Sequence, residues 1–124
     1  MKATLEKDVL KAIKQYLELA GCLVVRVNSG GIKAEHGGKK RFFRFNSETG
    51  CADLLCCVTT SKERGWHKQG EFLALEVKKP GGKATPEQKA FGERVALAGG
   101  TWACVSSIPE VRDVLRSMGA DRVP

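Results

Sequence analysis

The chain has 124 residues, of which 42% are hydrophobic and 28% are charged, a composition that excludes a disordered protein. A chain of this length forms one domain, residues 1–124, which can bury a core without a disulfide or a structural metal. Lys and Arg number 21 against 14 Asp and Glu. The resulting net charge of +7 indicates an anionic partner, with nucleic acid preferred over a membrane surface.

The sequence carries no signal for secretion or membrane insertion. Its longest apolar run, residues 54–58, is far shorter than the ~20 residues that span a bilayer. The N-terminus lacks the apolar region of a signal peptide. The five cysteines show no zinc-ligand spacing and are expected to be reduced. We therefore expect a cytoplasmic, intracellular protein with no membrane partner.

The first predicted element is an amphipathic helix over residues 5–20, with Thr4 as its N-cap and Gly21 as its C-terminal stop. Glu6 breaks the pattern, because it projects into the apolar arc of the helix. A strand of buried type follows over residues 22–27.

The rest of the chain alternates strand patterns, turns and capped helices. In chain order these are a basic, glycine-containing segment (33–41), a strand or hairpin arm (41–45), a core strand (52–58), a surface hairpin loop (59–70), a strand (71–78), a helix (86–98), a strand (101–105) and a last helix (108–119). Thr85 and Gln88 have the spacing of a capping box. The order α-β-(β)-β-β-α-β-α predicts an α/β domain with a mixed central sheet flanked by helices.

Three carboxylates occupy positions where burial is expected: Glu6 on the helix, Asp53 at the start of one strand and Glu76 within another. A lone buried carboxylate is costly, so each needs an ion partner, a hydrogen bond or a cation. The strand pleat places Glu76 and Lys78 on one face, about 7 Å apart. If the two strands are neighbours, two carboxylates and an ammonium group converge, which suits a divalent cation beside a group that handles water.

Each member of this set also has a structural explanation. In this explanation, Glu76 and Lys78 would form an ion pair at a sheet edge and Asp53 would cap a turn. Glu6 would be a first-turn acid that the helix dipole favours. These three explanations together require three coincidences in a basic domain, so we prefer the site.

The ordered set resembles the PD-(D/E)XK nuclease superfamily, and within it most nearly the VRR-NUC family. Its motifs are Glu6, Asn28-Ser29-Gly30-Gly31, Gly50-Cys51-Ala52-Asp53-Leu54, Glu76-Val77-Lys78, Thr85-Pro86-Glu87-Gln88 and Gly99-Gly100. The resemblance covers almost the whole chain and implies a restriction-endonuclease-like core. One departure is Ala52, which stands where the superfamily name implies proline.

The resemblance also implies roles for the site residues. Mg²⁺ or Mn²⁺ would be held by Asp53, Glu76 and the main-chain carbonyl of Val77. Lys78 would orient or activate the attacking water and neutralise charge on the phosphate. Glu6 would complete the acidic cluster. Gln88 would position the water or phosphate, although its capping-box role is a complete structural alternative.

DNA contacts are expected mainly from basic residues between positions 33 and 44, with the alternative that this segment is a solvated loop. The candidate contacts are Asn28, Lys33, Lys39, Lys40, Arg41, Arg44, Lys79 and Lys83. Phe42, Phe43 and Phe45 are too apolar for a free loop, so core packing is preferred over base stacking, and a dimer contact is the third alternative.

The predicted function is that of a metal-dependent DNA endonuclease. The resemblance implies action on branched or four-way (Holliday) junction DNA by a homodimer, whose two sites would face opposed strands. The alternatives are a non-catalytic nucleic-acid-binding module and a restriction-type or RNA-processing nuclease.

Overall fold

The computed structural model describes residues 2–27, 31–44, 46–60 and 69–124. Its elements are α1 (Lys2–Leu19), β1 (Leu23–Arg26), β2 (Gly31–His36), β3 (Lys39–Arg44), β4 (Leu54–Thr59), β5 (Gly70–Val77), α2 (Pro86–Leu97), β6 (Thr101–Val105) and α3 (Ile108–Met118). The predicted order is confirmed, with two strands where one optional strand was expected.

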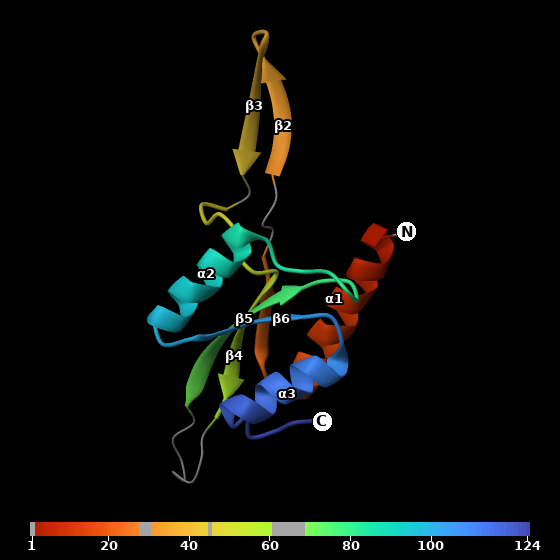
Figure 1. Ribbon diagram of the computed structural model, residues 1–124, viewed down its shortest axis with the longest axis vertical. Helices are drawn as coiled ribbons and strands as arrows, with labels where there is room; N and C mark the ends of the chain where they lie inside the picture. Colours follow the sequence, from red (N-terminus) through yellow and green to blue (C-terminus); the bar gives the residue numbers. More distant parts are fainter. Residues whose placement is uncertain (1, 28–30, 45, 61–68) are drawn as a thin grey trace.

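Four of the strands form a mixed central sheet in the order β1-β4-β5-β6. β4 is antiparallel to both of its neighbours, and β5 is parallel to β6. The crossover between the two parallel strands is made by α2, as parallel pairing requires. β2 and β3 form a separate antiparallel hairpin that projects from the body of the domain (Figure 1).

Helices cover both faces of this sheet (Figure 1). On one face α1 and α3 bury the main core, which includes Ile13, Leu17, Leu54, Leu73, Leu75, Val111 and Leu115. On the other face α2 packs through Val95 against Ala52 and Ala74. The candidate site carboxylates Asp53 and Glu76 lie where β4 begins and β5 ends.

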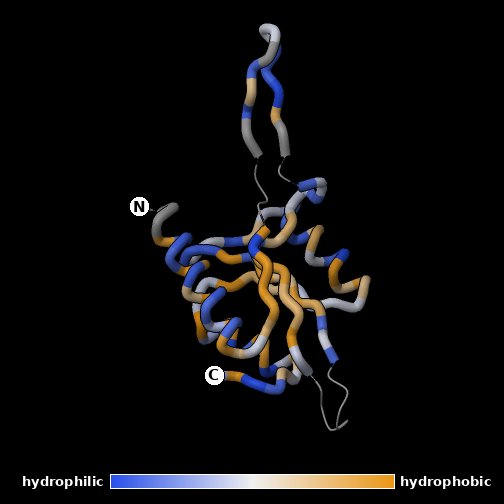
Figure 2. The backbone as a smooth tube through the Cα atoms, turned by 180° about the vertical axis from the view of Figure 1, so that it is seen from behind, coloured by the Kyte–Doolittle hydropathy of each residue, from blue (hydrophilic) through white to orange (hydrophobic). Residues whose placement is uncertain are grey.

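β1 differs from its prediction as a buried strand. Leu23 is 68% exposed and Val25 is 50% exposed. The physical reason is position: β1 is the edge strand beside β4, and α2 packs on the β5 and β6 side of the same face. In the view from behind, the two orange strands β1 and β4 run down the body with no helix in front of them (Figure 2).

The basic segment is the arm and turn of a hairpin instead of a solvated loop. Gly37 and Gly38 have φ values of +60° and +77°, which the tight turn between β2 and β3 requires. Phe42 on β3 is 55% exposed, so the prediction that it packs in the core is wrong. Phe45 lies outside the described residues.

The ends of α1 are a second correction. Thr4 lies inside the helix, which begins at Lys2, so it is not the N-cap. Gly21 has a φ of +83° and ends the helical segment as predicted. None of the helices in the described ranges is both long enough and apolar enough to cross a membrane.

Candidate active site

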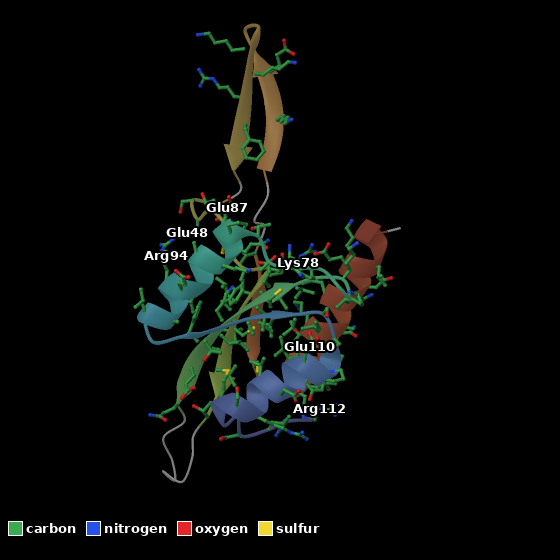
Figure 3. The ribbon with its side chains drawn as sticks, viewed as in Figure 1. Glu48, Lys78, Glu87, Arg94, Glu110 and Arg112 are labelled. Carbon is green, nitrogen blue, oxygen red and sulfur yellow. The ribbon has the colours of Figure 1, made fainter. Side chains whose placement is uncertain are left out.

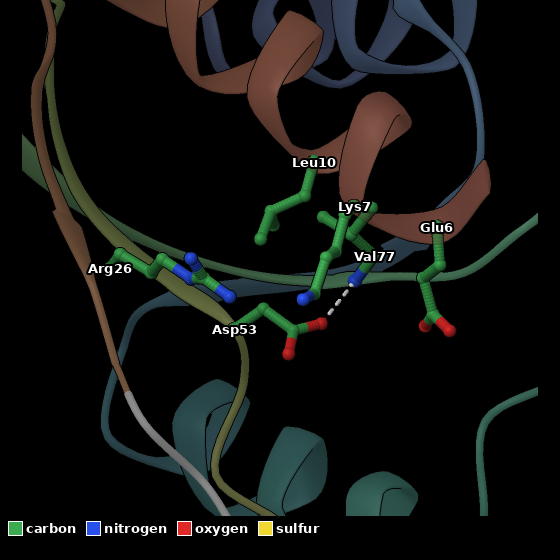
Figure 4. Close-up of a pocket in the computed structure, with 6 residues that line it drawn as sticks. All are labelled: Glu6, Lys7, Leu10, Arg26, Asp53 and Val77. Atoms are coloured by element: carbon green, nitrogen blue, oxygen red, sulfur yellow. Dashed lines mark hydrogen bonds between the residues drawn. The ribbon is translucent and has the colours of Figure 1, made fainter. Parts of the chain in front are cut away.

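Asp53 is fixed at the start of β4 by both neighbouring strands. Its main-chain oxygen accepts a 2.9 Å hydrogen bond from the amide of Val27, which follows β1. Its side-chain Oδ2 accepts a 2.8 Å hydrogen bond from the amide of Val77 at the end of β5. The Asp53 carboxylate is therefore held at the point where β4 and β5 separate, as Figure 4 shows.

Among the described residues, Glu76 is the charged residue that is buried. It lies on β5, an inner strand, and is only 3% exposed. Its Oε1 is 3.8 Å from the Lys78 ammonium nitrogen and accepts a 2.8 Å hydrogen bond from Gln88 Nε2. Its buried Oε2 has no hydrogen-bond partner among the described residues. Such an oxygen is an acceptor held ready for a cation or a proton.

The electrostatics of Glu76 follow from this setting. Its pKa is raised from 4.5 to about 8, mainly because burial disfavours the charged form. The negative charge of the neighbouring Asp53 raises this pKa further and Glu6 adds to the repulsion, whereas the Lys78 charge opposes the shift. Without a cation, the Glu76 carboxyl group therefore keeps its proton near neutral pH.

The Gln88 side chain bonds both to the N-terminal cap of α2 and to Glu76. Thr85 caps α2, and its Oγ1 accepts a 3.2 Å hydrogen bond from the Gln88 amide. The Gln88 Oε1 accepts a 2.8 Å bond from the Thr85 amide, which completes the predicted capping box. Its Nε2 is not used in the cap and donates the hydrogen bond to Glu76 Oε1. The helix cap and the site role, predicted as alternatives, are compatible.

The loop before Asp53 approaches the first turn of α2 very closely. Gly50 has a φ of +75°, and a Cβ at this position would collide with the main chain of Glu87 and Gln88. Farther along α2, Arg94 pairs with Glu48 of the same loop at 2.8 Å, and the two side chains lie together in Figure 3. Glycine at position 50 thus places Asp53 and Gln88 against the same carboxylate.

The opening helix completes the site from the opposite sheet face. A cavity of about 220 Å³ is lined by Glu6, Lys7, Leu10, Arg26, Asp53 and Val77. In Figure 4 the Lys7 and Arg26 side chains extend toward Asp53, and Glu6 lies on the far side of Val77. Lys78 lies at the end of β5 between α2 and α1 (Figure 3).

These residues fit a divalent cation. Within the described ranges, no three His, Cys, Asp or Glu side chains converge closely enough to form a metal site by themselves. Asp53 and Glu76 are nevertheless adjacent carboxylates, and one Glu76 oxygen is buried and has no partner among the described residues. Mg²⁺ is commonly bound by one or two carboxylates, and water molecules fill its remaining coordination positions. Asp53 bonds to the amide of the residue that follows Glu76, so these two carboxyl groups are neighbours, and Glu6 lines the same cavity as Asp53.

Each structural explanation weighed for these acids meets a specific difficulty. Glu76 and Lys78 do form an ion pair, but on an inner strand instead of an edge. Asp53 bonds to the distant Val77 amide and caps no local turn with that oxygen. Glu6 lies beyond the first turn of α1, which contains no acidic residue.

The predicted DNA contacts divide into two groups. On the hairpin, Lys33, Lys39, Lys40 and Arg41 are exposed, and Arg44 ends β3. On the body, Lys79 is the second residue after β5 and Lys83 lies exposed before α2. Asn28 lies outside the described residues.

Sequence reasoning missed two basic residues of the site, Lys7 and Arg26. In the sequence, Lys7 stands among the charged positions of an amphipathic helix pattern, and Arg26 stands within an apolar strand pattern, so neither was among the predicted site residues. The available signal was their position: Lys7 is adjacent to Glu6, and a cation in a predicted core strand needs an explanation as much as an acid does.

Comparisons with known proteins place this fold. No family model matches the chain, and no curated protein matches it. A solved structure described as "VRR_NUC domain" matches with 25% sequence identity and a TM-score of 0.56, covering 91% of this chain and 95% of that chain.

The mixed sheet, its flanking helices and this match define a restriction-endonuclease-like α/β domain. The same match supports the assignment of the chain to the VRR-NUC family, which confirms the resemblance seen in the sequence motifs.

Proposed function

We propose that this protein is a DNA endonuclease that hydrolyses phosphodiester bonds with the help of a divalent cation. The observation that carries the proposal is that Asp53, bonded to the Val77 amide, lies next to the buried Glu76, whose carboxylate is 3.8 Å from the Lys78 ammonium group. A domain with ordinary stability requirements gains nothing from two apposed carboxylates, because leaving them uncompensated is costly.

Mg²⁺ or Mn²⁺ would be held by Asp53, Glu76 and the main-chain carbonyl of Val77, with Glu6 at the periphery. When bound, the cation supplies Lewis-acid stabilisation of the phosphate and a more acidic water. Lys78 would orient the attacking water and neutralise charge that develops on the phosphate oxygens. Gln88 would hold the Glu76 carboxylate in one orientation, since it is anchored to the capped end of α2.

The proposed substrate class is branched DNA, including four-way junctions, as implied by the family resemblance. The hairpin supports this choice physically, because it carries exposed cations away from the carboxylates and so can reach a second arm of a branched substrate. Lys79 and Lys83 would contact the phosphates nearest the site.

We also propose a homodimer that packs through the exposed part of the sheet face on which α2 lies, at the β1 side. Leu23, Cys57 and Phe72 form one row across β1, β4 and β5, and all three are exposed. At the β1 end of this row Leu23 is 68% exposed. Two copies that each carry a charge of +7 repel, so an uncharged apolar surface is where they can meet.

Leu23→Lys tests this contact, with Leu19→Lys as its matched control, since both leucines are 68% exposed. Sedimentation equilibrium should show a monomer for Leu23→Lys and an unchanged dimer for Leu19→Lys. A wild-type monomer at all concentrations would reject the dimer.

Nuclease activity is tested with supercoiled plasmid, a synthetic four-way junction and a linear duplex of the same sequence. Each is incubated with Mg²⁺, Mn²⁺ or EDTA. We expect cleavage only with a cation and faster cleavage of the junction. Asp53→Asn and Glu76→Gln should abolish cleavage and retain DNA binding.

Glu93→Gln is the control, because it makes the same chemical change at an exposed position of α2. Binding without cleavage under every cation would favour the non-catalytic module. Cleavage of RNA in place of DNA would favour the RNA-processing nuclease.

A further inference from the structure

A second hollow continues from the carboxylate cavity along α1. It has a volume of about 370 Å³ and is lined by Lys7, Asp8, Leu10, Lys11, Lys14 and Arg26. Lys7, Leu10 and Arg26 also line the cavity that contains Asp53. The two hollows therefore share a wall, and the charged face of α1 leads directly to the candidate active site.

The second hollow is strongly basic. Four cationic side chains face one carboxylate, Asp8, in its lining. Lys7, Lys11 and Lys14 follow the i, i+4, i+7 spacing that places them along one stripe of α1. Arg26, the last residue of β1, forms the opposite wall. At the distal end Lys14 pairs with Glu18 at 3.1 Å, so the uncompensated charge is concentrated near the active site.

We propose that this groove between α1 and β1 binds the sugar-phosphate backbone of the substrate strand next to the cleaved bond. The inference rests on the proposed nuclease function, which places one phosphate of the strand at Asp53 and Glu76. The chain that continues from that phosphate must leave the site over a neighbouring surface, and this groove is a basic surface that adjoins it on the α1 side.

The dimensions agree with a short run of phosphates. Lys7 and Lys14 are seven residues apart, which is about 10 Å along a helix axis. Duplex DNA rises about 3.4 Å per nucleotide on each strand, so the stripe spans about three nucleotides. Lys7 and Arg26 line the cavity of Asp53 as well as the groove and would hold the first phosphate in it, and Lys11 and Lys14 would hold those beyond it.

The test compares two double variants with the same loss of charge. Lys11→Gln/Lys14→Gln removes two cations from the groove, and Lys89→Gln/Arg116→Gln removes two from exposed positions of α2 and α3. DNA affinity is measured in EDTA as a function of salt, and cleavage is measured with Mg²⁺. The groove variant should bind at least tenfold more weakly, its log–log salt slope should be shallower by about two, and the loss in cleavage should appear in KM.

Neutral methylphosphonate linkages then locate the contact on a substrate whose cleavage position has been mapped. Linkages placed at the second and third nucleotides on one side of the cleaved bond, where Lys11 and Lys14 would bind, should weaken wild-type binding and leave the groove variant unaffected. Equal losses for the groove and control variants, or additive effects of linkage and variant on both sides, would overturn the inference.

The groove and the nuclease function fail separately. Cleavage with no selective loss in the groove variant overturns the groove alone. Selective loss of binding without any cleavage overturns the nuclease function and supports the groove as a backbone-binding surface. A wild-type protein that binds no DNA overturns both.

Discussion

The carboxylate centre and the β2–β3 hairpin are both charged, but the domain holds their charges in opposite ways. Glu76 is 3% exposed and is tied to Gln88 and Lys78, whereas Lys33, Lys39, Lys40 and Arg41 are exposed on a projecting hairpin. A buried charge needs compensation from specific partners, and an exposed charge is compensated by water and salt. In the proposed nuclease, this difference separates two tasks. Hydrolysis needs atoms in fixed positions, whereas the first binding of DNA needs positive charge that extends away from the body of the domain.

The largest expected effect lies at the centre, in Lys78→Met. Loss of the ammonium group should lower kcat by roughly 10²–10³-fold, because it removes a positioned charge from the reacting phosphate. DNA affinity should change little, since one of many cations is lost. Lys89→Met on α2 is the control. Equal kcat for wild-type protein and Lys78→Met would remove this lysine from the proposed mechanism.

The second prediction concerns stability against pH in the absence of a cation. The pKa of Glu76 is about 8 in the folded protein, above the ordinary 4.5. Between these values the folded state keeps a proton that the unfolded state releases, so the free energy of unfolding should fall as pH rises through this window. The loss should be a few kcal/mol.

Urea denaturation at pH 5, 6.5 and 8 in EDTA measures this loss, and Glu76→Gln should flatten the dependence. Mg²⁺ should raise the stability of the wild-type protein more at pH 8 than at pH 5, because proton and cation compete for the same oxygens. Parallel profiles for the wild type and Glu76→Gln would contradict the burial assigned to this carboxyl group.

The third prediction uses the loop that supports the centre. Gly50→Ala should destabilise the domain by about 2–3 kcal/mol, because the new Cβ meets the main chain of α2 in addition to the left-handed strain. Gly81→Ala has a similar positive φ with open space around its Cβ and should lose only about 1 kcal/mol. Thermal unfolding checks both variants, and equal losses would show that the close approach at Gly50 is dispensable.

The centre was more predictable from sequence than the surface around it. Glu6, Asp53 and Glu76 stand out because acids in apolar patterns are costly wherever they are placed. The capping box of α2 is local chemistry, and it was confirmed with its hydrogen bonds. The contact between Gln88 and Glu76 depends on tertiary packing, so sequence offered it only as one of two alternatives.

The rest was hidden because exposure is decided by neighbours. An apolar strand such as β1 has the same pattern at a sheet edge as in the middle, so its exposed Leu23 and Val25 were not foreseen. The basic segment lacks strong apolar alternation, and its hairpin depends on a turn at Gly37 and Gly38. The basic groove lies between α1 and β1, and only the folded structure brings its residues together.

The smallest expected effect distinguishes the two faces of the hairpin. The register pairs Lys33 with Phe42 and Glu35 with Lys40, and directly opposed residues share a face. Lys39 and Arg41 lie on the other face, free of the compensating Glu35. One backbone cannot contact both faces at once, so we expect the Lys39 and Arg41 face to contribute more.

Lys39→Gln/Arg41→Gln should weaken DNA binding about tenfold at 0.1 M salt and reduce the salt slope by one to two. Lys33→Gln/Lys40→Gln loses the same formal charge and should weaken binding about threefold, because Glu35 already offsets part of that face. Titrations of fluorescently labelled junction DNA measure both. Neither variant should change kcat, since all four cations lie on the projecting hairpin, away from the carboxylates. If both doubles lose affinity equally, the hairpin acts only through its net charge, and the separation between fixed chemistry and unspecific capture becomes sharper still.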